Sequence, residues 1–248
     1  MHILLTRPQR ESIDAALTLK QMGHDVSLVP LLEILPLDEE ARDQRIAEIL
    51  DGGKPDSVIC VSKNAVYWGL PKLMERWREA REEASWFALG SGSAEALAAL
   101  SVESVVPAKS QSESLLDISE LQQASGQRVL YIVGENGRTL IENELKTRGA
   151  DVLRWEVYRR RPDQAAAEQL QRMNRVPDLL TAMSGESLLA LDQALPESNR
   201  RDWLSKTLLV PSERVAMLAR ERGFGRVEVV AVTEKDWPLN YLRDEASL

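Results

Sequence analysis

The stretch RVLYIVGENGRTLIENELKTRGADVLRWEVYRRRP, residues 128–162, contains a strand, a turn, a helix and a second strand in succession. Residues 129–133 are an uninterrupted apolar run bounded by a glycine turn, which is the pattern of a buried strand. Apolar residues then recur at helical spacing, so we predict a helix that opens at Arg138 and closes at Gly149. The second extended segment reaches Tyr158 and a group of arginines. This is the strand–helix–strand unit of an α/β sheet.

The same order of strand, small-residue turn and helix recurs along the rest of the chain. Strands that alternate with helices of about 10 to 15 residues predict parallel sheets covered by helices on both faces. The spacing of the units varies, which argues against a solenoid of regular repeats. The other expected strands include 2–6, 26–30, 55–61, 85–90, 177–183, 206–210 and 226–232. A polar helix is expected after the last of them.

About ten strands are too many for one small doubly wound sheet, so we predict two α/β domains of roughly half the chain each. Two extended stretches, 30–36 and 155–162, end in proline, and the residue before a proline favours extended geometry. They are therefore the candidate segments in which the chain crosses between domains. If the chain leaves one domain at the first stretch and returns at the second, the segment between them is an inserted domain.

The composition is that of a soluble globular protein, with 44% hydrophobic and 28% charged residues. The formal net charge of −8 makes nucleic acid a poor candidate for a partner. No apolar run approaches about 18 residues and the N-terminus lacks a signal-peptide pattern, so we expect a cytoplasmic protein without a membrane partner. The single cysteine, Cys60, fits a reducing compartment. His2 and His24 are too few and too far apart to suggest a metal site. We also expect a monomer, because no long exposed apolar pattern requires a partner.

Hydroxyl groups and glycines follow nearly every predicted strand. In an open parallel sheet, ligands bind beyond the carboxyl ends of the strands, where these turns lie. Serine and threonine commonly cap the next helix, which is the simpler interpretation of any single one. Several capped helix N-termini could also bind an acidic ligand. The turns are Thr6-Arg7-Pro8, Ser62-Lys63-Asn64, Ser91-Gly92-Ser93, Gly134-Glu135-Asn136-Gly137-Arg138, Ser184-Gly185-Glu186-Ser187 and Pro211-Ser212-Glu213-Arg214.

Tyr158 and the arginines at 159–161 stand at the end of an extended segment. Tyr158 is either a half-buried packing residue or a proton or hydrogen-bond donor at a leaving group. The arginines form either a solvated surface run or a cationic binding site. Together with the preceding glycine turn, they suggest a large acidic ligand.

The motifs of nucleotide-binding and hydrolase sites are incomplete or missing. Residues 90–95, GSGSAE, resemble half of a dinucleotide fingerprint, but Glu95 stands where the third glycine is needed. The sequence contains no phosphate-binding loop and no GxSxG nucleophile turn, and its two histidines argue against a Ser–His triad. A nucleotide-dependent enzyme is therefore disfavoured.

Stretches spread over almost the whole chain resemble the uroporphyrinogen-III synthase family. These enzymes close the linear tetrapyrrole hydroxymethylbilane, a small-molecule substrate, into uroporphyrinogen III. The matching stretches are LLTRP at 4–8, VSKNAV at 61–66, GSGSAEAL at 90–97, VPAKSQSESLL at 106–116, GENGRTLIENEL at 134–145, GADVLRWEVYRR at 149–160 and VPSERVAMLARERG at 210–223.

The resemblance implies two parallel-sheet α/β domains joined by a pair of extended antiparallel linkers. The implied boundaries are a discontinuous domain of 1–33 plus 160–248, an inserted domain of 38–155, and linkers at 34–37 and 156–159. It further implies an enzyme that uses neither a metal nor an organic cofactor.

The resemblance also assigns roles to side chains. It implies that Tyr158 is catalytic and assists departure of the substrate hydroxyl. It implies substrate-binding roles for Arg7, Ser62, Ser93, Arg138, Ser184 and Ser212. The residues themselves leave an alternative open, a non-catalytic two-domain clamp for a polyanionic small ligand, because the same hydroxyl-rich turns would serve it.

Overall fold

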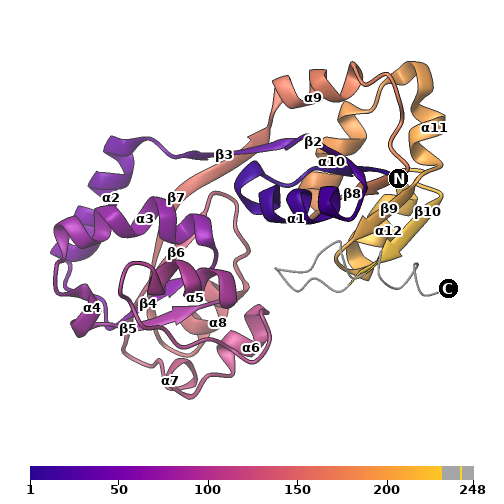
Figure 1. Ribbon diagram of the computed structural model, residues 1–248. Coiled ribbons are helices and arrows are strands. Elements are labelled where there is room, and N and C mark those ends of the chain that lie inside the picture. The colour runs from indigo at the N-terminus through magenta and orange to yellow at the C-terminus, as the bar shows by residue number, and fades with distance from the viewer. Residues whose placement is uncertain (231–240, 242–248) are drawn as a thin grey trace. The chain divides into compact units, whose positions relative to one another are not determined.

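The computed structural model describes residues 1–230 and 241, without the side chains of residues 9–11. The chain divides into two compact units, each built on its own sheet (Figure 1). Unit 1 consists of Met1–Glu33 and Arg161–Leu248, and unit 2 of Ile34–Arg160. Unit 2 is therefore continuous in sequence, whereas unit 1 is assembled from both ends of the chain.

Unit 2 is built on a five-stranded sheet. Its strands lie in the order β3 (Leu32–Pro36), β7 (Asp151–Pro162), β6 (Arg128–Gly134), β4 (Ser57–Cys60) and β5 (Ser85–Ala88). The pairs β7–β6, β6–β4 and β4–β5 are parallel. Because helices cover both faces of such a sheet, its central strands are short continuous apolar runs and not alternating ones.

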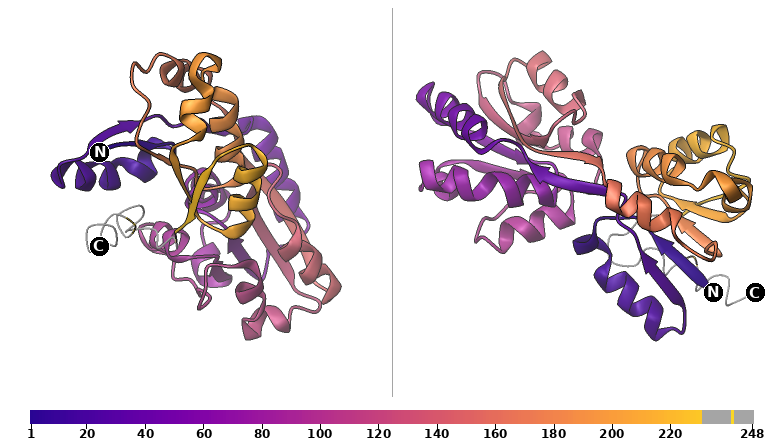
Figure 2. Two further views of the ribbon diagram at one scale, coloured as in Figure 1. Left: turned by 90° about the vertical axis from the view of Figure 1, so that its right-hand side faces the viewer. Right: turned by 90° about the horizontal axis from the view of Figure 1, so that it is seen from above.

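Helices pack on both faces of the unit 2 sheet (Figure 2). One core includes residues of α2 (Glu39–Asp51), α3 (Lys63–Arg76), α4 (Ala80–Glu83) and α5 (Ser91–Ala98). The other includes residues of α6 (Ser112–Leu116), α7 (Ser119–Gln122) and α8 (Leu140–Thr147). Since side chains alternate along a strand, β6 contributes Ile132 to the first core and Tyr131 and Val133 to the second.

Unit 1 is built on a second five-stranded sheet, which is parallel throughout. Its strands lie in the order β10 (Arg226–Val229), β9 (Thr207–Val210), β8 (Leu179–Thr181), β1 (His2–Leu5) and β2 (Asp25–Leu28). Its helices are α1 (Gln9–Gln21), α9 (Gln164–Gln171), α10 (Gly185–Ala194), α11 (Arg200–Leu204) and α12 (Glu213–Glu221), with a 3-10 turn at Glu197–Asn199. Buried residues of α1 belong to one core and those of α9 to α12 to the other.

The two extended stretches that end in proline lie side by side. The amide of Leu37 donates to the carbonyl of Val157 at 3.2 Å, and the amide of Asp163 donates to the carbonyl of Leu31 at 3.0 Å. Residue numbers therefore rise along β3 as they fall along β7, so the two strands run antiparallel.

The prediction of two parallel α/β sheets is confirmed. The helix expected to open at Arg138 is wrong at its start, because α8 begins at Leu140. Asn136 has φ of 57°, in the left-handed region, and the first helical carbonyl is that of Thr139, which accepts from Asn143 N–H at 2.8 Å. The helix ends as predicted before Gly149, whose φ is +89°.

The polar helix expected after the last strand lies outside the described residues. Among the residues that are described, no helix combines the length and the apolar character needed to cross a membrane.

Replacing Ile132 by alanine tests the packing of unit 2. Ile132 is fully buried, and its Cγ2 would lie 2.9 Å from a Cβ built on Gly69 of α3, so helix and strand are in close contact. Ile132→Ala should lower the free energy of unfolding by about 2–5 kcal/mol, from lost burial and the cavity left behind. Ile13→Ala is the matched control, because Ile13 is 41% exposed. It should change stability by less than about 0.5 kcal/mol. Urea unfolding midpoints check both, and equal losses would contradict the assignment of the core.

Candidate active site

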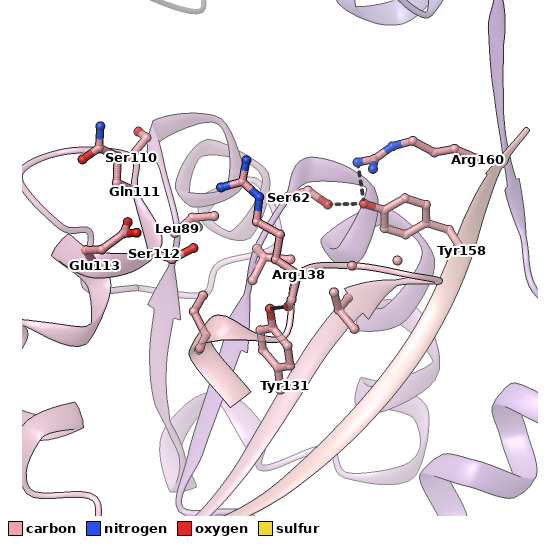
Figure 3. A pocket seen from close by; sticks show the side chains of 15 residues that line it. Ser62, Leu89, Ser110, Gln111, Ser112, Glu113, Tyr131, Arg138, Tyr158 and Arg160 are labelled. Carbon is pink, nitrogen blue, oxygen red and sulfur yellow. Dashed lines mark hydrogen bonds between the residues drawn. The ribbon is translucent and has the colours of Figure 1, made fainter. Parts of the chain in front are cut away.

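The carboxyl ends of the parallel strands of unit 2 surround a pocket of about 510 Å³ (Figure 3). Such ends are the usual ligand sites of open α/β sheets. Ser62 follows β4, Leu89 follows β5, and Arg138 follows β6. The other lining residues are Val61, Ser110, Gln111, Ser112, Glu113, Tyr131, Val133, Gly134, Gly137, Ile141, Tyr158 and Arg160.

The phenol of Tyr158 is hydrogen-bonded to two other side chains on one side of the pocket. The residue is only 2% exposed, yet its oxygen lies 3.1 Å from Ser62 Oγ and accepts a hydrogen bond from Arg160 Nη2 at 3.0 Å. The Arg160 guanidinium also lies 5.3 Å from the centroid of the ring. Ser62 is itself positioned as the N-cap of α3, where its Oγ accepts from the amide of Ala65 at 3.0 Å. The phenol oxygen is therefore located by groups from two segments of the chain, the start of α3 and the end of β7.

Two proton arrangements satisfy this cluster, because either hydroxyl can donate in the Ser62–Tyr158 bond. If Tyr158 donates, its proton is used within the protein. If Ser62 donates, the phenol accepts from both Ser62 and Arg160, and its own proton is available to a ligand. A ligand that accepts a hydrogen bond from Tyr158 would select the second arrangement. The site can thus present a proton donor without moving a side chain.

Arg138 enters the pocket from the loop between β6 and α8. The hydroxyl of Tyr131 donates to the carbonyl of Arg138 at 3.2 Å, and Arg154 Nη2 donates to the carbonyl of Gly137 at 3.4 Å. Figure 3 shows the Arg138 side chain rising from this anchored loop between Glu113 and Tyr158. Burial raises the pKa of Tyr131 to about 12, and the nearby charge of Arg154 opposes that rise. Tyr131 therefore stays protonated near neutral pH and remains a donor to the loop.

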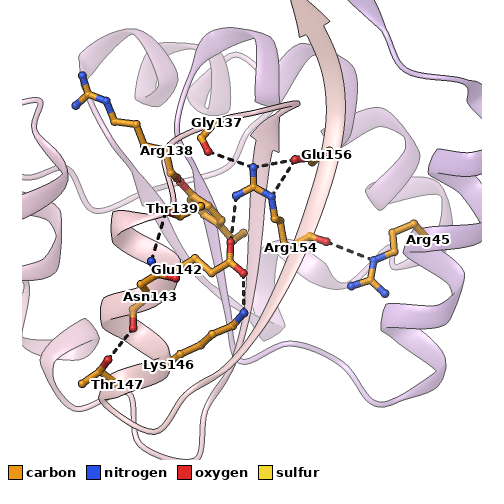
Figure 4. A network of polar contacts seen from close by, with 11 residues as sticks. Arg45, Gly137, Arg138, Thr139, Glu142, Asn143, Lys146, Thr147, Arg154 and Glu156 are labelled. Atoms are coloured by element: carbon orange, nitrogen blue, oxygen red, sulfur yellow. Dashed lines mark hydrogen bonds and ion pairs between the residues drawn. The ribbon is translucent and has the colours of Figure 1, made fainter.

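Arg154 is the centre of a network below this loop (Figure 4). Its Nη1 pairs with Glu142 at 3.1 Å and its Nη2 with Glu156 at 2.8 Å, and the guanidinium lies 5.8 Å from the centroid of the Tyr131 ring. Lys146 pairs with Glu142 at 2.6 Å. Burial opposes ionisation of Glu142, but the hydrogen bonds and charges of Lys146 and Arg154 outweigh it and lower the pKa of the carboxyl. The network ties β7 to both the loop and α8.

The charged residues that line the pocket are Arg138, Arg160 and Glu113. Two guanidinium groups suit an anionic ligand, because guanidinium binds carboxylates in a two-pronged geometry. The pocket thus provides local positive charge on a protein whose formal net charge is −8.

The structure brings together three of the residues singled out from the sequence. Tyr158, Ser62 and Arg138 line the pocket. Ser93 belongs to the same unit but is buried within α5, where its Oγ donates to the carbonyl of Gly90 at 3.2 Å, and it does not line the pocket.

The remaining three predicted residues belong to unit 1 and stand at the carboxyl ends of its strands. Arg7 follows β1 and is half-buried. Ser184 follows β8 and caps α10 in a reciprocal pair with Ser187, whose amide donates to Ser184 Oγ at 3.0 Å. Ser212 follows β9 and occupies the N-cap position of α12 without a side-chain capping bond.

Sequence reasoning left some lining residues unassigned. The sequence left open whether Arg160 belongs to a solvated surface run or to a cationic binding site. Residues two apart on a strand share a face, so its placement beside Tyr158 could have been inferred. Ser110, Gln111 and Glu113 lie within the stretch at 106–116, but no spacing in the sequence directs them to this pocket.

Glu142→Gln tests whether the network stabilises the protein. A carboxyl whose pKa is lowered on folding contributes stability above the pKa of the unfolded chain, about 4.3, and loses it as pH falls through the folded pKa. Glu142→Gln should therefore cost roughly 1–3 kcal/mol at pH 7, and this deficit should shrink toward pH 3. The control is Glu144→Gln on the same helix, which breaks a more exposed pair with Arg148 and should cost less than about 0.5 kcal/mol. Urea unfolding at several pH values checks this, and a deficit independent of pH would count against it.

Comparisons with known proteins give one consistent result. The family model of the uroporphyrinogen-III synthase HemD matches residues 14–236. The chain is 31% identical to the uroporphyrinogen-III synthase of Escherichia coli (strain K12), over 98% of this chain and 100% of the relative. It is 32% identical to the enzyme of the same name from Salmonella typhimurium (strain LT2), again over 98% of this chain and 100% of the relative. A crystal structure of a mutant uroporphyrinogen III synthase from the extremely thermophilic bacterium Thermus thermophilus covers 100% of both chains, with a TM-score of 0.65 and 18% identity, and so shares the fold. The chain belongs to the uroporphyrinogen-III synthase family.

Proposed function

We propose that the pocket around Tyr158 is where this chain converts hydroxymethylbilane into uroporphyrinogen III, with loss of water and inversion of ring D. Family membership supports the reaction. The observation that supports this location is the cluster of Tyr158, Ser62 and Arg160 at the strand ends, with Arg138 lining the same pocket.

The first step is loss of the terminal hydroxyl of the substrate. In the arrangement where Ser62 donates to the phenol, Tyr158 directs its proton to the leaving oxygen, which departs as water. Arg160 donates to the same phenol oxygen and stabilises the negative charge that develops there. The proton that the tetrapyrrole loses when the ring forms can return to Tyr158, so the side chain ends as it began.

The second step is ring closure with inversion. The azafulvene left by water loss is attacked by the substituted carbon of ring D, and the resulting spiro intermediate breaks and recloses with that ring inverted. Hydroxymethylbilane also cyclises unaided, without inversion, so the protein has to redirect a facile reaction. Holding the chain in the folded geometry can supply about 7–11 kcal/mol in favourable cases. Arg138 and Arg160 are suited to this task because the substrate carries carboxylates.

The other predicted substrate-binding residues, Arg7, Ser93, Ser184 and Ser212, remain part of the proposal. Ser93 has the weakest support of these, since its hydroxyl is engaged inside α5. The proposed working form is a cytoplasmic monomer that acts on a small molecule without nucleic acid, metal or organic cofactor. The single cysteine and the acidic net charge support the compartment and the lack of a nucleic-acid partner.

A coupled assay tests the reaction directly. Hydroxymethylbilane is generated in situ by its upstream synthase, the purified chain is added, and the oxidised porphyrin products are separated by isomer. The type III isomer should be the main product, and its rate of formation should rise in proportion to the amount of chain added. A folded protein that leaves only the type I isomer would overturn the proposal and favour a non-catalytic clamp for a polyanionic ligand.

Tyr158→Phe tests the proton donor. Removing the hydroxyl should lower the rate of type III formation by about 10²–10⁴-fold, the usual contribution of a positioned acid. Tyr67→Phe is the matched control, because Tyr67 is 49% exposed and lies outside the pocket lining. It should leave the rate unchanged. Retention of nearly full rate by a folded Tyr158→Phe variant would remove the assigned role.

A further inference from the structure

The pairing of β6 with β7 changes register at the end that carries Tyr158. The register is regular from Arg128 opposite Asp151 up to Val133 opposite Glu156, and then Gly134 lies opposite Tyr158. Val157 is therefore an extra residue on β7. Two residues on one strand opposite one on the other is the arrangement of a β-bulge, which turns the side chains that follow it.

The bulge changes the face of the sheet to which Tyr158 belongs. In a regular strand, successive side chains point to opposite faces of the sheet. Tyr158 would then point to the same face as Val152, and Val157 to the other face. Instead Val157 and Tyr158, although consecutive, are both buried in the core that holds Trp155, whereas Val152 belongs to the other core. This rotation allows the phenol to reach Ser62 at the end of β4.

The ring of Tyr158 occupies the space that a side chain at position 134 would need. A Cβ built on Gly134 would lie 2.6 Å from Tyr158 Cζ, 2.8 Å from Cε2 and 3.0 Å from the phenol oxygen. The first two separations are too short for non-bonded carbon atoms, whose best separation is about 3.5–4.0 Å. The backbone of Gly134 does not adopt a positive φ, so the need for glycine comes from space and not from backbone conformation.

The ring has little freedom to yield to such a side chain. Its backbone is tied to the same loop, since the amide of Glu135 donates to the carbonyl of Tyr158 at 2.7 Å. Its oxygen is engaged by Ser62 and Arg160, and the residue is 2% exposed. Displacing the ring would therefore break the bonds that define the proton donor.

We propose that Gly134 is a positioning residue for the synthase reaction, which together with the bulge at Val157 seats the phenol of Tyr158 against Ser62 and Arg160. The proposal rests on the catalytic role proposed for Tyr158. Gly134 acts through that side chain and contributes no chemistry of its own. A misplacement of about 1 Å can cost a reaction 10²-fold.

Gly134→Ala is the test, measured by the formation of uroporphyrinogen III from hydroxymethylbilane. The turnover rate should fall by about 10²-fold while KM changes far less, because Arg138 still lines the pocket. The matched control is Gly225→Ala. A Cβ there meets nothing closer than the Leu204 carbonyl at 3.7 Å, so the rate should stay at the wild-type value.

A double-mutant cycle separates positioning from general damage. If Gly134 acts through the phenol, Gly134→Ala should cost less than about threefold in a Tyr158→Phe background, although it costs about 10²-fold in the wild type. Equal losses in both backgrounds would overturn the proposal, as would a Gly134→Ala variant with the wild-type rate.

Tyrosine labelled with ¹³C at Cζ supplies a readout that does not depend on activity. The chain has four tyrosines, and the Tyr158 resonance is identified by its loss in Tyr158→Phe. Gly134→Ala should shift this resonance, and Gly225→Ala should not. If Tyr158→Phe keeps the full rate, the catalytic role fails, but this resonance still decides whether Gly134 positions the phenol.

If Gly134→Ala is too unstable to assay, a measurement of thermal stability tests the proposal instead. Truncating the ring in Tyr158→Ala removes the atoms that the new Cβ would meet. Gly134→Ala should then lower the thermal midpoint of Tyr158→Ala by no more than about 2 °C, whereas it lowers that of the wild type by considerably more. If Gly134→Ala lowers the thermal midpoint equally in the two backgrounds, the new Cβ clashes with atoms other than the Tyr158 ring, and the proposal is overturned.

Discussion

The parallel pairing of β6 with β7 is the constraint on which the rest of the candidate site depends. Because β6 and β7 are adjacent and parallel, the loop after Gly134 and the end of β7 lie at the same edge of the sheet. Arg138, on that loop, and Tyr158, on β7, therefore line the same pocket. β4 pairs on the other side of β6 and adds Ser62 at the same edge. Strand order therefore brings Ser62, Arg138 and Tyr158 together, whereas Ser110 and Gln111 reach the pocket from the irregular segment that precedes α6.

The sequence predicted the elements of this arrangement better than their ends. Continuous apolar runs such as VICV and VLYIV can be buried on both faces, which is why they specify central strands of parallel sheets. The start of α8 could not be read in this way. The helix was expected to open at Arg138, directly after the glycine turn, but the carbonyl of that residue accepts a hydrogen bond from Tyr131, and the turn at Asn136 delays the helix. Both features lie outside the helix, so the spacing of apolar residues within the helix does not predict them.

The same distinction applies to the candidate site. Hydroxyls and cations at strand ends suggested an acidic ligand, and the family resemblance singled out Tyr158, Ser62 and Arg138 among them; the pocket contains all three. Ser93 met the same criterion, but its hydroxyl turns back to the carbonyl of Gly90. Spacing cannot distinguish a serine that faces its own helix from one that faces a ligand. Gly134 was predicted as a turn glycine, and its closeness to the Tyr158 ring arises only because the register changes beside it.

Two phenols line the pocket, and their surroundings suit them to different tasks. Tyr131 donates to a backbone carbonyl, and burial raises its pKa to about 12, so its proton is committed to holding the Arg138 loop. Tyr158 is equally buried, but its partners are a hydroxyl that can either donate or accept and a guanidinium that only donates. Such partners can satisfy the oxygen while leaving its proton to a ligand. Which tyrosine can act as an acid is thus decided by the hydrogen-bonding capacity of its neighbours, because the two residues are alike in burial and lie on adjacent strands.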